Sequence, residues 1–344
     1  MSFIQLSRQY RGRAVAAMIV AAGLAACAED QPTAPISKVP TEASSQLGGN
    51  PKPNCWPNCA PVARILYVKG DTTLKIGRIW VMNPDKTGQT QLTFGNGDDD
   101  YPSWSPDYKK VAFQSKRRGG WEIFVMNADG SNQTPITTVP PGAWDDHPTW
   151  SPDGKKIYFT RAAWDAANSM WHGDIYSVNP NGGGLTKVTN YQNVGLFDPT
   201  VSPDGKKILV TRTTAGVFDV GHLFTINTDG TGPTQITNTD MGEGMAAWSP
   251  DGTKIVLVTN NNYPNYREIA TVNTDGTGFK MILARPGPQE HPSWAADGSR
   301  IVFVDFGGSN KWGWLFTVKP DGTGLTQLQE SFDLGSYYSP SWSR

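Results

Sequence analysis

A short phrase, Pro-x-Trp-Ser-Pro-Asp-Gly, returns in register along most of this chain, and it limits the possible folds more than any other feature. The tryptophan position recurs at intervals of 46 to 51 residues, at Trp104, Trp150, Val201, Trp248, Trp294 and Trp342. A period of this size indicates a repeat architecture, in which each unit buries its apolar face only against its neighbours.

Each repeat predicts four short strands. In the unit after Val201, the phrase is followed by alternating runs at residues 207–210 and 222–225, a turn at 227–232 and a last run at 234–237. Apolar and polar residues that alternate with period two indicate β-strands, and Asp-Gly supplies the positive φ that tight turns need. Tyr108 stands where other copies have glycine, so we expect strained backbone there.

Four strands per repeat predict the blades of a β-propeller, with the tryptophan as a wedge between neighbouring blades. Composition agrees with this. Glycine (37) and proline (26) together form about 18 % of the 344 residues, against roughly 12 % in an average protein. Such a turn-rich chain argues against a helical bundle and against an enzyme built on amphipathic helices.

The sixth repeat is split between the two ends of the chain. The C-terminus stops in a first strand at Trp342, and the strands missing from that blade occur at residues 64–68, 78–81 and 90–93. We therefore predict an all-β fold over residues 62–344. It is a six-bladed propeller of four-stranded antiparallel blades, closed by pairing of the C-terminal strand with the N-terminal strands. Closure removes free sheet edges.

These phrases resemble the TolB-like six-bladed propeller repeat of bacterial envelope proteins. The resemblance covers residues 62–344 and implies the propeller fold, an envelope location and a role like that in the Tol–Pal system. TolB itself carries an α/β domain before the propeller, and we expect only a targeting segment and a tether in that place here.

The N-terminus predicts export. Three arginines precede the apolar run Ala14–Ala26, and Leu24-Ala25-Ala26-Cys27 resembles the lipobox of bacterial lipoproteins. The resemblance implies a signal peptide over residues 1–26, acylation of Cys27 and a membrane anchor. Ala28 after the cysteine indicates the outer membrane. The alternative is an ordinary secretory signal with an incidental cysteine.

Residues 27–61 are rich in proline and serine and predict a disordered tether. Cys55 and Cys59 close this segment. An oxidising periplasm favours a disulfide between them, and a metal site is disfavoured because no histidine lies nearby.

The residues just before each first strand are expected to line the mouth of the central channel and to bind the ligand. Many of them are acidic, so we expect a rim that attracts cations or a basic partner segment. The candidates are Asp98, Asp99, Asp100, Tyr101, Asp146, His147, Asp198, Met245, Glu290, His291 and Tyr338.

Two channel histidines raise a metal alternative, because some propeller lyases that act on uronic-acid oligomers use such residues. His147 and His291 are expected three blades apart, on opposite sides of the ring, so a hydrogen bond from each to a neighbouring blade is the favoured interpretation. His172 and His222 are expected in solvated loops. No metal site, catalytic residue or cofactor is predicted.

The net charge is −1 and no basic stripe occurs, so a nucleic-acid partner has no electrostatic basis. A nucleophile elbow of the form Gly-x-Ser-x-Gly is also missing from the sequence. We therefore expect a monomeric, non-enzymatic propeller that faces the periplasm and binds an envelope protein or a peptidoglycan-associated partner. The alternative is a carbohydrate-binding protein or a metal-dependent lyase.

Overall fold

A computed structural model describes residues 63–71, 76–166, 170–214, 221–262, 266–307, 313–328 and 337–342. The predicted signal peptide, the acylated Cys27, the tether and the Cys55–Cys59 disulfide lie outside these residues. The described residues belong to one compact unit, Pro61–Arg344. Among them, no helix is long and apolar enough to cross a membrane.

Six four-stranded antiparallel sheets form this unit, as the repeat predicts. Blade 1 contains β24 (Tyr337–Trp342), β1 (Ile65–Asp71), β2 (Ile76–Met82) and β3 (Thr90–Gln91). Blade 2 contains β4 (Asp99–Trp104), β5 (Lys110–Ser115), β6 (Glu122–Asn127) and β7 (Thr134–Pro135). Blade 3 contains β8 (Ala143–Trp150), β9 (Ile157–Asp165), β10 (Met170–Val178) and β11 (Thr186–Lys187).

The remaining blades follow the same order. Blade 4 contains β12 (Val194–Val201), β13 (Lys207–Thr214), β14 (Gly221–Asn227) and β15 (Thr234–Gln235). Blade 5 contains β16 (Glu243–Trp248), β17 (Lys254–Asn262), β18 (Tyr266–Asn273) and β19 (Lys280–Leu283). Blade 6 contains β20 (Gln289–Trp294), β21 (Ile301–Asp305), β22 (Trp314–Val318) and β23 (Thr326–Gln327).

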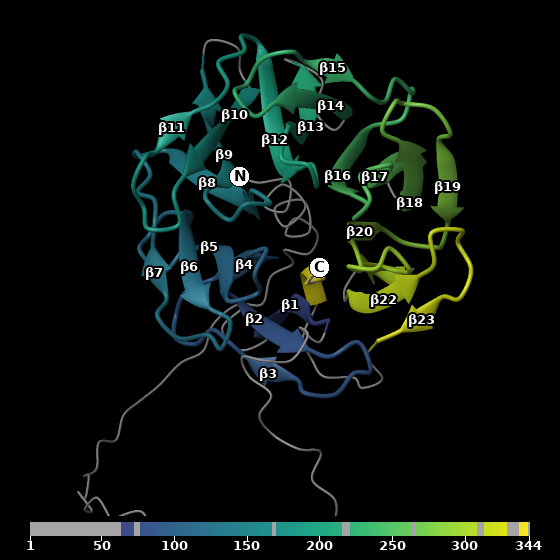
Figure 1. Cartoon of the computed structure of the whole chain (residues 1–344), viewed down its shortest axis with the longest axis horizontal. Helices are drawn as coiled ribbons and strands as arrows, with labels where there is room; N and C mark the ends of the chain where they lie inside the picture. Colours follow the sequence, from purple (N-terminus) through teal and green to yellow (C-terminus); the bar gives the residue numbers. More distant parts are fainter. Residues whose placement is uncertain are drawn as a thin grey trace, which may run out of the picture. The chain divides into compact units, whose positions relative to one another are not determined.

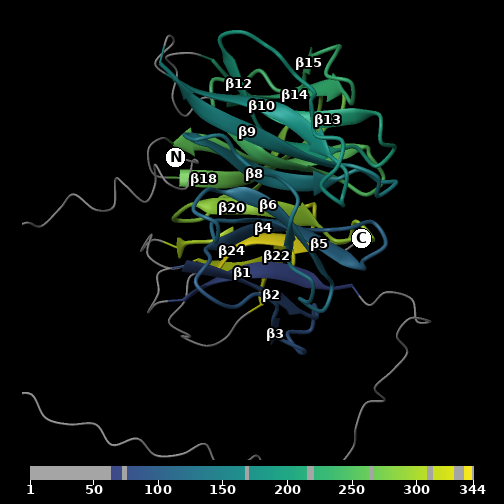
Figure 2. The same ribbon diagram turned by 90° about the vertical axis from the view of Figure 1, so that its left-hand side faces the viewer.

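The blades are arranged radially around a central axis, with the first strand of each repeat innermost (Figure 1). Figure 2 shows the ring from its edge. In blade 1 the innermost strand is β24, which pairs with β1, so the two ends of the propeller meet in one sheet. The predicted closure of the ring is confirmed.

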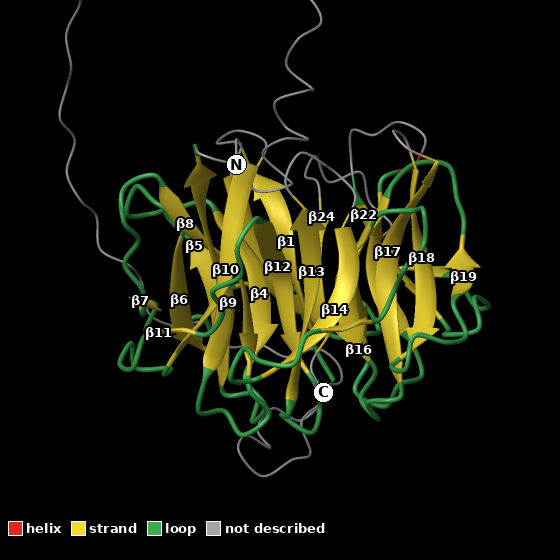
Figure 3. Cartoon of the chain, turned by 90° about the horizontal axis from the view of Figure 1, so that it is seen from above, coloured by secondary structure: helices red, strands yellow, loops and turns green. Residues whose placement is uncertain are grey.

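Antiparallel pairing gives the ring two distinct faces, at the two ends of the strands (Figure 3). We call the one with the Ser-Pro-Asp-Gly turns, such as residues 105–108, the turn face. The other carries the hairpins between second and third strands, such as residues 116–121, and we call it the hairpin face. Tyr108 has φ 58° where Gly154 has 69°, so the predicted strained turn is confirmed.

Apolar side chains fill the space between neighbouring blades. One cluster joins Leu66 and Ile79 of blade 1 to Phe113 and Phe124 of blade 2, and all four are buried. Burying such a side chain stabilises the fold by roughly 2 kcal/mol. The ring is therefore held together by contacts that only adjacent blades can make.

The repeated tryptophans are wedges between blades, as predicted. Trp150 belongs to blade 3, and its Nε1 donates to the backbone oxygen of Ser103 in blade 2 at 3.1 Å. Trp248 and Trp294 make the same bond to the preceding blade, at 3.2 Å in each case.

Candidate functional site

One position of the innermost strand has the same unusual backbone in all six blades. Three residues before each tryptophan position, φ lies between 44° and 54°. The six residues are Tyr101, His147, Asp198, Met245, His291 and Ser339. A left-handed backbone at a residue other than glycine costs about 1 kcal/mol or more. We call these six residues the strained ring.

A β-bulge produces each strained residue. In blade 3, the pairing of β8 with β9 shifts register between Asp146 and Thr149. In blade 6, β20 and β21 shift between Glu290 and Ser293. A bulge reorients one side chain out of the normal alternation. Here the six reoriented residues all line one cavity.

The strained ring forms the inner end of a cavity of about 250 Å³. From there the cavity extends along the innermost strands towards the turn face. Its walls come from matching positions of successive blades. Prolines and tryptophans such as Pro102 and Trp104 are buried there, and the residue between them, such as Ser103 or Thr149, is partly exposed. The channel therefore has a polar floor, and its walls present hydroxyl groups as well as apolar atoms.

Tyr101 lies at the centre of the floor, between two histidines. Its ring centroid is 3.6 Å from that of His147 and 5.4 Å from that of His291. Nε2 of His291 lies 3.3 Å from the Tyr101 hydroxyl. Since His147 is in blade 3 and His291 in blade 6, Tyr101 connects opposite sides of the ring.

Carboxylates surround His147. Its Nδ1 lies 2.7 Å from Asp146 Oδ1, and its Nε2 lies 3.1 Å from Oδ1 of Asp198 in blade 4. Burial disfavours the charged imidazole, but the nearby Asp146 and Asp198 outweigh burial and raise the pKa of His147 to about 9. His147 is therefore a cation at neutral pH.

His291 titrates in the opposite direction. Burial lowers its pKa to about 4, and Glu290 offsets only part of that effect. Burial also raises the pKa of Tyr101, and Asp100 and Asp146 raise it further. At neutral pH the floor thus combines a charged His147 with a neutral His291 and a neutral Tyr101.

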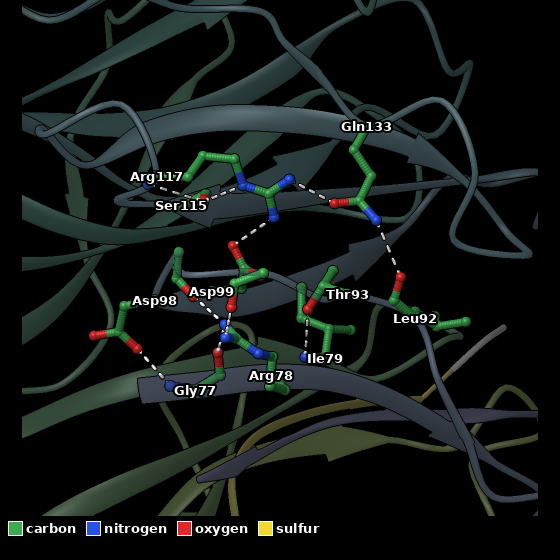
Figure 4. Close-up of polar contacts among 12 residues, drawn as sticks. Gly77, Arg78, Ile79, Leu92, Thr93, Asp98, Asp99, Ser115, Arg117 and Gln133 are labelled. Atoms are coloured by element: carbon green, nitrogen blue, oxygen red, sulfur yellow. Dashed lines mark hydrogen bonds and ion pairs between the residues drawn. The ribbon is translucent and has the colours of Figure 1, made fainter. Parts of the chain in front are cut away.

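The predicted acidic rim is wrong as an exposed surface. Asp99 is fully buried in β4 and accepts a hydrogen bond from Arg117 Nη2 at 2.8 Å. Oδ1 of Asp98 accepts from the backbone nitrogen of Gly77 in blade 1 at 2.6 Å (Figure 4). Asp100 and Asp146 are also buried. These carboxylates lie within or between blades because each has a partner there.

Five of the predicted rim residues line the cavity: Tyr101, His147, Asp198, Met245 and His291. Five do not: Asp98, Asp99, Asp100, Asp146 and Glu290. Glu290 pairs with Arg267 at 2.6 Å. The Tyr338 backbone pairs with Val68, and its side chain lies outside the described residues. The predicted mouth is thus corrected: the cavity extends to the turn face, where Pro106, Pro152 and Pro250 line it.

His172 and His222 are not in loops. His172 lies in β10 with its Nε2 3.1 Å from Asp174, and His222 lies in β14 with its Nδ1 2.8 Å from Glu243. The predicted hydrogen bond to a neighbouring blade is made by the backbone of His147, whose nitrogen donates to Gln114 Oε1 of blade 2 at 3.3 Å, while its Nε2 makes an ion pair with Asp198 of blade 4. His291 instead reaches across the channel to Tyr101. Within the described ranges, no three His, Cys, Asp or Glu side chains are grouped so that they could hold a metal ion.

Sequence reasoning missed two parts of the site. It identified the positions of the strained ring but not the bulges, because nothing in the residue types Tyr, His, Met or Ser predicts a positive φ. It also missed the walls of the cavity. The repeated Pro-x-Trp spacing could have revealed these walls, because residues in register on equivalent strands must converge around the axis.

The chain matches the TolB beta propeller domain over residues 26–171 and 166–344. It belongs to the TolB β-propeller family. Among curated proteins it is 31 % identical over 103 residues to an uncharacterized protein of Agrobacterium fabrum, and 35 % identical over 79 residues to a TolB homolog of Chlorobium luteolum. These matches cover 28 % and 23 % of this chain, and only 35 % and 17 % of the relatives.

Solved TolB structures share the fold. TolB from Acinetobacter baumannii superposes with a TM-score of 0.68 at 20 % identity, over 82 % of this chain and 66 % of that one. A putative TolB from Agrobacterium tumefaciens gives 0.58 at 17 % identity, over 78 % and 90 %.

An oligogalacturonate lyase in complex with manganese is also similar, with a TM-score of 0.54 and 17 % identity over 76 % of this chain and 73 % of the lyase. Identity at this level shows a shared fold and carries no activity across. In this chain the two channel histidines already contact Tyr101, Asp146 and Asp198.

Proposed function

We propose that this chain is a non-enzymatic binding scaffold of the bacterial envelope. It holds a partner in the cavity on its turn face, between the strained ring and the walls of the innermost strands. The proposed binding site is therefore the cavity, and not the exposed rim that the sequence predicted.

The observation that carries the proposal is the strained ring. Six residues share one costly backbone conformation, yet their side chains all differ except for the two histidines. The structural positions around them are far more uniform, with proline at five of six following positions and tryptophan at five of six wedge positions. Strain that gathers at one place beside a cavity is typical of a binding site.

Membership of the TolB propeller family and the N-terminal lipobox support an envelope location. In this proposal Cys27 carries the lipid anchor in the outer membrane, and residues 27–61 tether the propeller on the periplasmic side. The partner is an envelope protein or a peptidoglycan-associated protein, as in a Tol–Pal-like assembly. The curated matches cover only part of each relative, so they do not carry this partner-binding role. Its support comes from the cavity and the predicted tether.

Site-specific crosslinking in the native envelope tests the proposal. A photoreactive residue replaces Met245, which lines the cavity, or Leu185, which is exposed outside it in the turn before β11. We expect Met245 to yield one discrete protein adduct that Leu185 does not yield. If both positions give the same adducts, or if neither gives any, the cavity is not the binding site.

A further inference from the structure

The chain contains ten dipeptides in which asparagine or aspartate precedes glycine, and one of them differs from the rest. In nine, the glycine lies in a tight turn with φ between 69° and 91°, and its N–H donates to a backbone oxygen at 2.8 or 2.9 Å. Gly130 and Gly182 are examples. In the tenth, Asn96-Gly97, the glycine lacks the positive φ, and its N–H donates to no oxygen of the residues that the structure describes.

Asn96 lies in the link between β3 of blade 1 and β4 of blade 2. Lys116, in the hairpin after β5, donates its backbone N–H to Asp98 O at 2.9 Å, so this link lies on the hairpin face. The Asn96 side chain is exposed and makes no hydrogen bond within the described part of the chain. An exposed side chain of this kind changes rotamer readily and can turn towards its own backbone.

The other Asn-Gly dipeptide of the chain is held in place. Asn181 Oδ1 accepts a hydrogen bond from Gly183 N at 3.0 Å, and Gly182 N donates to Asn179 O at 2.9 Å. Both the side chain and the nitrogen that follows it are thus engaged in the turn between β10 and β11. A reaction between them has to break these bonds first, which slows it by up to roughly tenfold for each bond.

Packing explains why residue 97 is glycine. A Cβ atom at this position would lie 2.8 Å from Cβ of Arg117 and 3.3 Å from Ser115 Oγ, so a side chain would clash with the neighbouring hairpin. Glycine carries no side chain that could shield its own nitrogen. The fold therefore requires, directly after Asn96, the residue type that is easiest to approach.

A buried cation lies against the same link. Arg78 is 5 % exposed, and its guanidinium donates to the backbone oxygens of Gly95 and Gly97 and to Gly77 O at 3.3 Å. Its acceptors are all neutral, and no Asp or Glu of the described ranges forms an ion pair with it. Because buried charges are normally paired, this environment favours a negative charge on residue 96, between the two glycines.

We propose that Asn96 is a site of spontaneous deamidation, in which the Gly97 nitrogen attacks the side-chain amide of Asn96. A bond forms between this nitrogen and Cγ, the bond between Cγ and Nδ2 breaks, and the proton of the nitrogen leaves with the amide group as ammonia. Water then opens the cyclic imide at one of its two carbonyl carbons, which gives isoaspartate or aspartate. Attack within one molecule needs only the correct approach of the two groups.

The modification places a carboxylate next to the Arg78 guanidinium. In isoaspartate, the Cβ atom of residue 96 also becomes part of the backbone, which lengthens the link between blades 1 and 2. The link lies on the hairpin face, whereas the cavity extends to the turn face. This inference is therefore independent of the proposed function.

Peptide mass spectrometry of the full chain tests the proposal, with Asn181 as the control inside the same molecule. The chain is kept in detergent in a mildly alkaline buffer made with heavy-oxygen water, so that each new carboxylate carries a heavy oxygen atom. We expect Asn96 to be deamidated at least about tenfold faster than Asn181. In urea, where the chain is unfolded, we expect the two rates to agree within about twofold.

Asn96→Gln is the matched variant. Glutamine keeps the amide but has to close a larger ring, so we expect the labelled product at residue 96 to disappear and the rate at Asn181 to stay the same. An unchanged melting temperature would show that the variant folds.

Asn96→Asp imitates one product of the reaction. We expect it to raise the melting temperature, because Arg78 gains a counter-ion. Asn181→Asp should leave the melting temperature unchanged, since aspartate stands at this turn position in other blades, as at Asp129. A lower melting temperature of Asn96→Asp would contradict the pairing with Arg78.

Three results would overturn the proposal itself. The first is equal rates at Asn96 and Asn181 in the folded chain. The second is an unmodified Asn96 in the folded chain after a time in which the unfolded chain is modified. The third is a difference that persists in urea, because neighbouring residues in the sequence, and not the fold, would then set the rates.

Discussion

The backbone of Trp342 in β24 pairs with that of Ile65 in β1, so the last strand of the propeller completes the blade that its first strand begins. Both side chains belong to one buried cluster that also includes Val302 and Leu315 of blade 6. The two ends of the propeller are thus joined by hydrogen bonds and by shared core packing.

Deletion of Pro340–Arg344 should open the ring. It removes the buried Trp342 and part of the β24 ladder, and loss of a buried tryptophan alone costs about 3 to 5 kcal/mol. We expect the melting temperature to fall by at least about 6 °C. An unchanged melting temperature in calorimetry would show that closure contributes nothing.

The two channel histidines predict a stability maximum near pH 6.5. The pKa of His147 is raised to about 9. Its contribution to the free energy of unfolding is therefore complete below pH 6.5 and is lost as pH rises towards 9. The pKa of His291 is lowered to about 4, so its contribution is complete above pH 6.5 and is lost as pH falls towards 4. Each effect is on the order of 3 kcal/mol.

Each histidine variant serves as the control for the other. Denaturant unfolding across pH 4 to 9 measures how the free energy of unfolding depends on pH. We expect His147→Gln to flatten this dependence only on the alkaline side, and His291→Gln to flatten it only on the acidic side. If one substitution changes both slopes equally, the opposite titration of the two residues is refuted.

A matched pair of substitutions tests the hydrogen bond made by a tryptophan wedge. Trp150 Nε1 donates to Ser103 O, whereas Nε1 of Trp104 is buried without a hydrogen-bond partner among the described residues. Trp150→Phe should therefore cost about 1 kcal/mol more in unfolding free energy than Trp104→Phe. Equal losses would mean that the indole hydrogen bond does not contribute.

Buried and exposed arginine pairs should differ strongly. Arg161 makes bonds of 2.6 and 2.8 Å to the fully buried Asp145, whereas the half-exposed Arg118 lies 3.4 Å from Glu122. Arg161→Met should cost about 3 kcal/mol because it leaves a buried carboxylate unpaired. Arg118→Met should cost less than about 1 kcal/mol. Urea unfolding of both variants measures this difference, and similar losses would contradict it.

The lipid anchor can be tested directly. Cys27→Ser removes the thiol that acylation requires, so the protein should move from the membrane fraction to the soluble fraction after cell lysis. Cys55→Ser is the control and should stay with the membrane. Persistent membrane association of Cys27→Ser would show that another segment anchors the chain.

The repeat determined the architecture because its signals are local. The alternation in residues 207–210 and the turn at 227–232 each specify a strand or a turn without help from distant residues. The register of six copies then fixes the number of blades, and the split repeat fixes the closure between Ile65 and Trp342. Apolar periodicity and turn chemistry suffice wherever each unit repeats the same contacts.

Only the tertiary structure decided which side chains reach the cavity. In the sequence Asp99 looks like part of an open rim, but it is buried and paired with Arg117 of the hairpin after β5. Burial lowers the pKa of His291, whereas Asp146, together with Asp198 of the next blade, raises the pKa of His147 against the same burial. The floor exists because each innermost strand is bulged at the same position, and the residue types at these bulges do not predict a positive φ.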